Sequence, residues 1–296
     1  MSKQHPIIAV TGASGAGRGV VRSVFQRVCD REAIRPAFVE GESFHRFTRA
    51  EMRDRTAEAR AGGDTSFSHF GPAANVFAEQ EKLYRAYGET GVARIRHYAH
   101  TADDARALGW PDVGAGEFTP WHDLPDPSDC LIYEGLHGVV KADGVDLSKL
   151  VDLKIGVTPI MNLEWIQKMH RDTKVRGYSE EAVVEQILNR MPDYVRYVIP
   201  QFKISDINFQ HVAVVDTSDP MVARDVPTLD ERVVVIRFRK PEEFGVDFPW
   251  LLSNLPKSWM SRRNTLVVPG SSYELAMEMI ITPILRRLME WRKRGA

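Results

Sequence analysis

The stretch IIAVTGASGAGRGV, residues 7–20, decides the fold of this 296-residue chain. An apolar, β-branched run ends at Thr11, and Gly12, Gly15 and Gly17 follow before a helix-like pattern begins. This layout is typical of a buried strand that leads into a phosphate-binding loop, because glycines leave backbone N–H groups free to surround an anion at a helix N-terminus. The alternative interpretation is a simple glycine-rich turn between a strand and a helix.

The end of this loop departs from the usual side-chain pattern. The GxxxxG frame is followed by Arg18 and Gly19, where the usual motif has Lys and then Ser or Thr. The sequence therefore predicts a phosphate-binding loop whose side-chain contributions are altered. Its residues are Gly12, Ala13, Ser14, Gly15, Ala16, Gly17, Arg18 and Gly19.

Bulk composition places the chain among globular proteins and excludes several partners. It is 43% apolar and 27% charged with a formal net charge of −1, so no overall field attracts nucleic acid or anionic lipid. Cys29 and Cys130 have no metal-binding spacing and indicate a reducing compartment. No apolar run approaches a membrane span, and a core strand begins within the first residues. We expect a cytoplasmic protein without a nucleic-acid or membrane partner.

Short apolar runs alternate with helical stretches along the chain. Buried strands are expected at 6–12, 36–42, 129–135, 151–159 and 211–218, with a helix at about 19–31 after the first. Runs that are apolar throughout suit parallel strands covered by helices on both faces. The order predicts an α/β, doubly wound mixed sheet of the P-loop NTPase type.

The remaining segments are expected to complete one domain over residues 1–296. Strands at 233–239 and 264–270 extend the sheet, in an arrangement that can be antiparallel, and an amphipathic helix covers 271–294. The polar segment 50–116 is interpreted as an excursion near the site. A lid is expected at about 165–200 and a C-terminal sheet extension at about 229–296.

Charged residues follow the second expected strand, where ligands bind in open α/β sheets. In EGESFHRFTRAEMR, residues 40–53, a carboxylate such as Glu42 could take a proton from a hydroxyl nucleophile. His45, Arg49 and Arg53 could hold a phosphorylated acceptor. The alternative is an ordinary solvated helix start.

An acid closes the strand in DCLIYEGLHG. Glu134 ends this run opposite the glycine-rich loop, which is where such folds hold Mg²⁺. The structural alternative is a cap on the following helix. The pairing with the loop favours the metal.

The most charged predicted helix is NLEWIQKMHRDTKVRGYS. Lys168, Arg171 and Asp172 are spaced to point to one side of it. An ordinary i,i+4 ladder explains Lys168 and Asp172, but it does not require the cations Arg171 and Arg176. Phosphoryl transfer does require such cations, because negative charge spreads over the migrating group.

These residues lie in motifs that resemble the bacterial-type phosphoribulokinases, P-loop kinases related to uridine kinase. The resemblance runs nearly end to end. Its blocks include EGxxFHRF, SFSHF (66–70), YGETG (87–91), YEGLHG (133–138), DLKIGVxPxxNLEWIQKxHRDxxxRGY, DINFQ (206–210), VVVIRFR and SWMSRxNxxVVPG.

The resemblance implies ATP-dependent phosphorylation of the 1-hydroxyl of ribulose 5-phosphate, with Mg²⁺ as the metal. By motif, Glu42 is the catalytic base, Lys168 stabilises the transferring phosphoryl group, and Glu134 and Asp172 lie at the metal, where Asp172 is also a catalytic acid. The implied ligands of the sugar phosphate are His45, Arg49, Arg53, Arg171 and Arg176.

The family resemblance also implies regulation and assembly. Members respond to NADH as activator and AMP as inhibitor, and Arg237 and Arg262 resemble the arginines implicated in this control. A homo-oligomer is expected, built from dimers and extending to an octamer. No thiol switch is expected, because neither Cys29 nor Cys130 lies in the loop.

Three departures from the family pattern affect residues that would take part in the reaction. Arg18 and Gly19 replace the usual Thr and Ser, and Glu42 replaces an Asp. The longer side chain moves the base by roughly 1 Å, which can cost about 10²-fold in rate. Two other functions are therefore considered besides an active ribulose 5-phosphate kinase. One is a degenerate homologue that senses nucleotide or sugar phosphate, and the other is a kinase for a different phosphorylated sugar.

Overall fold

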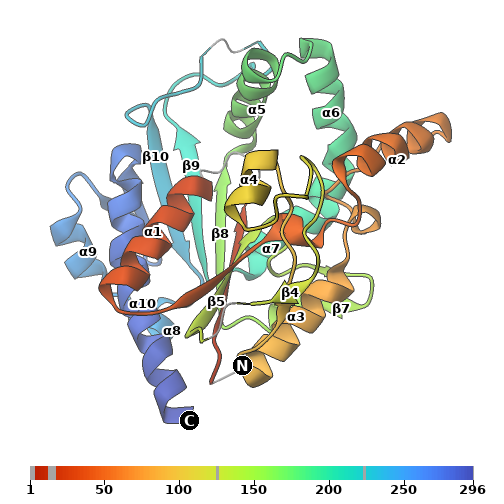
Figure 1. Cartoon of the computed structure of the whole chain (residues 1–296). Helices are drawn as coiled ribbons and strands as arrows, with labels where there is room; N and C mark the ends of the chain where they lie inside the picture. Colours follow the sequence, from red (N-terminus) through yellow and green to blue (C-terminus); the bar gives the residue numbers. More distant parts are fainter. Residues whose placement is uncertain (1–3, 13–17, 125–126, 223–224, 296) are drawn as a thin grey trace.

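The computed structural model describes residues 4–12, 18–124, 127–222 and 225–295. At its centre is an eight-stranded sheet in the order β11-β12-β10-β9-β8-β1-β5-β2 (Figure 1). The strands are β1 (Ile7–Gly12), β2 (Pro36–Glu40), β5 (Cys130–Gly135), β8 (Leu153–Pro159), β9 (Ile207–Ala213), β10 (Arg232–Phe238), β11 (Trp259–Arg262) and β12 (Thr265–Pro269). The first five in chain order pair in parallel and the last three pair antiparallel, which confirms the predicted mixed sheet.

Helices cover both faces of the sheet, as the fully buried β1 and β5 require. On one face α1 (Arg18–Arg31) and α10 (Tyr273–Gly295) pack side by side, with Phe25 and Ile281 in their apolar cluster. On the other face α3 (Phe77–Thr90) buries Tyr84 and Tyr87 against the strands. The expected α/β architecture is confirmed (Figure 1).

Shorter elements connect and flank these layers. The other α-helices are α2 (Arg49–Ala61), α4 (Ala102–Ala107), α5 (Met161–His170), α6 (Glu180–Asp193), α7 (Ile199–Ile204), α8 (Pro241–Phe244) and α9 (Phe248–Asn254). Two-residue strands pair as β3 (Arg94–Ile95) with β4 (His122–Asp123) and β6 (Lys141–Ala142) with β7 (Val145–Asp146). The 3-10 turns are η1 (Gly41–Phe44), η2 (Pro72–Ala74), η3 (Leu147–Lys149) and η6 (Gly270–Ser272), and the π-helical turns are η4 (Arg171–Val175) and η5 (Tyr194–Val198).

The strand expected at 211–218 was placed too far along the chain. β9 starts at Ile207 and ends at Ala213, while Val214 and Val215 are 61% and 40% exposed. Their β-branched side chains carry strand propensity, but no layer covers them. The buried strand instead uses Ile207 and Phe209, because these residues pack in the core against α10.

Two further sequence expectations need correction. The helix expected at 162–179 is broken, since α5 ends at His170 and η4 follows as a π-helical turn. The segment 50–116 is more than a polar excursion, because α3 within it forms one apolar layer of the core. The edge strand β11 was not expected as a strand.

The carboxyl ends of the parallel strands meet at one edge of the sheet. Glu40, the last residue of β2, lies in register with Glu134 near the end of β5, and Glu134 in turn lies in register with Val10 of β1. The helices α5 and α6 stand beyond this edge, and α2 projects from the same end of the molecule (Figure 1). The fold therefore brings the chemically interesting segments of the sequence to one place.

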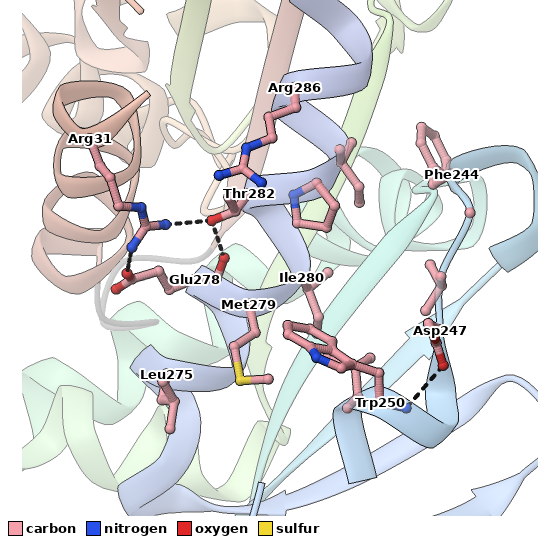
Figure 2. Close-up of a pocket in the computed structure, with 15 residues that line it drawn as sticks. Arg31, Phe244, Asp247, Trp250, Leu275, Glu278, Met279, Ile280, Thr282 and Arg286 are labelled. Carbon is pink, nitrogen blue, oxygen red and sulfur yellow. Dashed lines mark hydrogen bonds and ion pairs between the residues drawn. The ribbon is translucent and has the colours of Figure 1, made fainter. Parts of the chain in front are cut away.

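A second feature lies away from that edge. A groove of about 540 Å³ runs between α1, α9 and α10, and Figure 2 shows its lining residues. Trp250 and Leu275 give it an apolar surface, while Arg31 forms an ion pair with Glu278 and donates to Thr282 Oγ1 at 2.7 Å. No helix in the described ranges combines the length and hydrophobicity needed to cross a membrane.

Candidate active site

The strand and the helix predicted on either side of the glycine-rich loop are both confirmed. β1 ends at Gly12, which is buried, and α1 begins at Arg18. Residues 13–17 and the side chain of Arg18 lie outside the described structure, so the predictions about the loop as far as Gly19 stay predictions.

Glu134 lies beside this turn. It is half-buried near the end of β5, one strand away from the end of β1. The Tyr273 hydroxyl is buried close to it, and burial, together with the Glu134 charge, raises the pKa of Tyr273. A carboxylate thus lies on the strand next to β1, near the end from which the glycine-rich segment continues, and its role at a metal stays a prediction.

Glu42 follows at the same edge, in the 3-10 turn η1. Its position is fixed by a close backbone approach, because a Cβ added at Gly41 would lie 2.6 Å from Tyr133 Oη and 2.9 Å from Gly135 Cα. Only glycine fits there. The turn therefore holds the Glu42 backbone firmly against the end of β5.

His45 and His69 form a stacked pair next to Glu42. Their ring centroids are 4.1 Å apart with an interplanar angle of 25°. Burial, together with the charges of His45 and Arg190, lowers the pKa of His69 to about 3, and the Glu42 charge opposes the shift. The influence of Glu42 and Arg190 on one imidazole shows that residues far apart in the sequence share an electrostatic neighbourhood.

A cleft of about 470 Å³ opens between α2, α6 and the segment that carries His69. We call it the α2–α6 cleft. Its lining includes three arginines, together with several neutral polar residues: Arg53, Arg60 and Arg190, with His69, Gln186 and Asn189 among the neutral ones. The cleft therefore carries a strong positive charge beside the Glu42 neighbourhood.

Lys168, Arg171 and Arg176 converge on Asp172, which is 2% exposed. Lys168 Nζ donates to Asp172 Oδ2, while Arg171 Nε and Arg176 Nη1 donate to Oδ1 at 2.9 and 3.1 Å. Burial alone would raise the pKa of Asp172, but the hydrogen bonds from Arg171 and Lys168 outweigh it and lower the pKa. The predicted common side of Lys168, Arg171 and Asp172 is confirmed.

Arg190 is a second cation at this place, and sequence reasoning missed it. Its guanidinium lies 5.7 Å over the Phe70 ring and has no ion pair or hydrogen bond within the described residues. Burial lowers its pKa to about 10, with Arg171 and Arg176 adding to the effect and Asp172 opposing it. Its helix carries no recognisable motif, so no sequence signal marked it.

The predicted acceptor cations fall into separate groups. Arg53 borders the α2–α6 cleft with a side chain that is 79% exposed, and His45 reaches the cleft through its stack on His69. Arg171 and Arg176 hold Asp172. Arg49 begins α2 and donates through Nη2 to the His100 carbonyl oxygen at 2.9 Å.

Comparison with known proteins agrees with this geometry. The family model described as "Phosphoribulokinase / Uridine kinase family" matches residues 7–218. The chain belongs to this family. The matched residues include the glycine-rich loop, the cations around Asp172, the stacked pair of His45 and His69, and the α2–α6 cleft.

Relatives within the family match over their whole length. A phosphoribulokinase of Nitrobacter vulgaris is 52% identical over 295 residues, and a chromosomal phosphoribulokinase of Cupriavidus necator is 51% identical over 296, with 100% of each chain covered. The solved structure of phosphoribulokinase from Rhodobacter spheroides is 49% identical, covers 99% of this chain and 100% of its own, and has a TM-score of 0.89. The fold of this family member is therefore that of the solved enzyme.

The carboxylates of this family member can be tested as ligands of the Mg²⁺ that a kinase uses. No three His, Cys, Asp or Glu side chains converge as a metal-binding group in the described part of the chain. Mg²⁺ fits nonetheless, because it is commonly held by one or two carboxylates and substrate phosphates. Glu134 offers such a carboxylate. Asp172 has both oxygens occupied by cations and could reach a metal only if those contacts opened.

Arg237 and Arg262 line one pocket of about 750 Å³, whose lining also includes residues of β8 and β9. Arg237 Nη2 donates to the Phe202 carbonyl oxygen at 3.0 Å. The two arginines that the sequence singled out for regulation thus share one cavity, separate from the α2–α6 cleft.

Proposed function

We propose that this kinase transfers the γ-phosphoryl group of ATP to the 1-hydroxyl of ribulose 5-phosphate. The observation that carries the proposal is a carboxylate, Glu42, held at the carboxyl edge of the sheet beside a cleft that contains the half-buried cation Arg190, which has no ion pair among the described residues. Such a cleft suits an acceptor that carries a phosphate of its own. The relatives named phosphoribulokinase, at about half identity over their full length, support the same acceptor.

At the donor end, residues 12–19 bind the ATP phosphates and Glu134 holds Mg²⁺. The metal neutralises charge on the phosphate oxygens. Lys168 meets the charge that develops on the transferring group, because a fixed ammonium stabilises it without reorganisation. In the structure Lys168 is paired with Asp172, so this role needs the nucleotide to compete with that carboxylate.

At the acceptor end, Arg190 and Arg53 bind the sugar phosphate. A half-buried guanidinium without an ion pair is partly desolvated, which is costly, and a phosphate supplies bidentate acceptors that offset this cost. Glu42 then takes the proton of the 1-hydroxyl as that oxygen attacks. Arg171 and Arg176 both pair with Asp172. From there they complete the binding of the sugar phosphate.

The experiment is ADP release in a coupled assay with ATP, Mg²⁺ and a panel of acceptors. Ribulose 5-phosphate should give the highest kcat/KM, and uridine, which lacks a phosphate, should give none. Turnover with another sugar phosphate in preference to ribulose 5-phosphate would replace the proposed acceptor. Calorimetric binding of ribulose 5-phosphate without turnover on any acceptor would instead support the sensor alternative.

Regulation and assembly extend the proposal. NADH binds the pocket that contains Arg237 and Arg262, whose cations suit its pyrophosphate. Arg237→Gln should abolish activation by NADH while leaving the basal rate within about twofold, since this pocket is separate from the cleft. The protein acts in the cytoplasm as a homo-oligomer, for which light scattering should give at least the mass of a dimer.

A further inference from the structure

We propose that the imidazole of His69 is a substrate-contact residue that hydrogen-bonds an oxygen of the acceptor sugar, between Glu42 and the phosphate-binding end of the α2–α6 cleft. This inference deepens the proposed function and rests on it. His69 lies in the SFSHF block, whose residues received no role from the sequence.

The position of His69 supports this contact. Its ring lines the α2–α6 cleft together with Arg53 and Arg190. Its Nδ1 is buried and has no hydrogen-bond partner within the part of the chain that the structure describes. A buried polar atom without a partner is costly and is expected where a ligand supplies the missing bond.

The protonation state of His69 suits a sugar oxygen better than a phosphate. Its pKa is lowered to about 3, so the ring is neutral throughout the working range of pH. A neutral imidazole offers one N–H donor and one acceptor nitrogen, which match a hydroxyl or a carbonyl group. The phosphate is left to the neighbouring cation Arg190, whose charge also disfavours protonation of His69.

The backbone of His69 is anchored independently of its side chain. Its carbonyl oxygen accepts from Asn75 Nδ2 at 2.9 Å and lies 3.1 Å from His137 Nε2. The side chain stacks on His45. A purely structural role would therefore rest on the aromatic stack, and a phenylalanine would preserve that stack while removing both nitrogens.

This distinction defines the test. Steady-state KM values for ribulose 5-phosphate and for ATP are measured for the wild type, His69→Phe and His69→Gln. The matched control is His97→Phe, because His97 also packs its ring against a histidine, His122, in a tilted arrangement with ring centroids 5.2 Å apart, and its pKa is likewise lowered by burial. His97 does not line the α2–α6 cleft.

We expect His69→Phe to raise KM for ribulose 5-phosphate at least about tenfold, with KM for ATP unchanged, because a hydrogen bond to the acceptor is lost. His69→Gln keeps one N–H donor and should recover part of the loss, while His97→Phe should match the wild type. Thermal melting confirms that each variant is folded. A wild-type KM in His69→Phe, or equal losses in the phenylalanine and glutamine variants, would overturn the contact.

The two proposals fail in different ways. If the wild type turns over ribulose 5-phosphate and His69→Phe does so with an unchanged KM, only the His69 contact is wrong. If the wild type binds ribulose 5-phosphate without turnover, the same comparison is made with Kd from calorimetry. If the wild type neither binds nor converts this sugar phosphate, both the proposed function and the His69 contact are wrong.

Discussion

At the scale of single residues, we expect Arg190 to matter for substrate binding but not for the stability of the fold. Its guanidinium is half-buried without an ion pair in the described residues, so its partial desolvation costs the folded protein free energy. Arg190→Gln should leave the free energy of unfolding unchanged or raise it by about 1 kcal/mol. The same variant should raise KM for ribulose 5-phosphate at least about tenfold, because a charge-assisted contact with phosphate is lost.

Urea denaturation and steady-state kinetics measure the two effects of Arg190→Gln. Arg60→Gln is the control, since Arg60 lines the same cleft but is 46% exposed and pairs with Glu185 at 3.4 Å. It should change both quantities little. A clear loss of stability in Arg190→Gln with an unchanged KM would show that Arg190 is structural.

Glu42 is the second residue with a direct test. The rigid packing of Gly41 against Tyr133 fixes the backbone at Glu42, so the side-chain length sets where the carboxylate lies. Glu42→Asp should raise kcat, and Glu42→Gln should lower it by about 10²–10⁴ because the base is lost. Stopped assays at saturating substrate measure kcat for both variants. Equal rates in the wild type and in Glu42→Gln would contradict the assignment of the base.

At the scale of elements, the start of α2 depends on a close approach by Gly116. This glycine has φ of +86°, and an added Cβ would lie 2.6 Å from Arg49 Cβ. Gly116→Ala should displace Arg49, destabilise the fold by about 1–2 kcal/mol, and raise KM for ribulose 5-phosphate. Thermal denaturation and kinetics give the two values.

Gly109→Ala is the matched control for the α2 prediction. Gly109 has a similar φ of +84°, but nothing lies within 4 Å of an added Cβ. It should show the backbone strain alone, with KM unchanged. Equal changes of KM in the two alanine variants would argue against a role of Arg49 in acceptor binding.

The helix α5 carries a buried acid that makes stability depend on pH. Burial raises the pKa of Glu164 from 4.5 to about 7, against the hydrogen bond from Tyr194 Oη at 3.1 Å. Between these two pH values the unfolded chain releases the proton and the folded chain keeps it, so this group lowers stability as pH rises. The loss is complete above pH 7 and absent below 4.5.

Glu164→Gln removes this titration and keeps an acceptor for Tyr194. The variant should be more stable than the wild type by about 1–3 kcal/mol at pH 8, and nearly equal to it at pH 4.5. Denaturant unfolding at both pH values measures the difference. A difference that is the same at both values would contradict the buried charge.

The sequence predicted the elements that a local pattern of apolar residues marks. It failed where tertiary packing decides which residues are buried. β1, β5 and β8 were predicted because their sequences are apolar enough to be buried on both faces of the sheet. The register of β9 was missed, since only tertiary packing tells Ile207 from the exposed Val214. The π-helical turn after His170 has no periodic signature, so the break in the helix expected at 162–179 was also missed.

At the scale of the whole molecule, the carboxyl edge of one sheet brings distant segments together. The sequence indicated Glu42, Glu134 and Lys168 because each follows a strand or lies in a recognisable block. It could not indicate Arg190 or the buried Nδ1 of His69, which has no hydrogen-bond partner in the described residues, because their chemistry arises from packing against segments far along the chain. The full-length similarity to phosphoribulokinases is consistent with a site assembled from the whole chain.

The central claim is that this edge performs phosphoryl transfer from ATP to ribulose 5-phosphate. The most direct measurement is the initial rate of ADP release with ATP, Mg²⁺ and ribulose 5-phosphate, for the wild type and for Lys168→Met. We predict a rate that depends on the sugar phosphate and falls by about 10²-fold or more in the variant, because the cation at the transferring group is lost. A wild-type rate no higher than that of Lys168→Met would contradict the account.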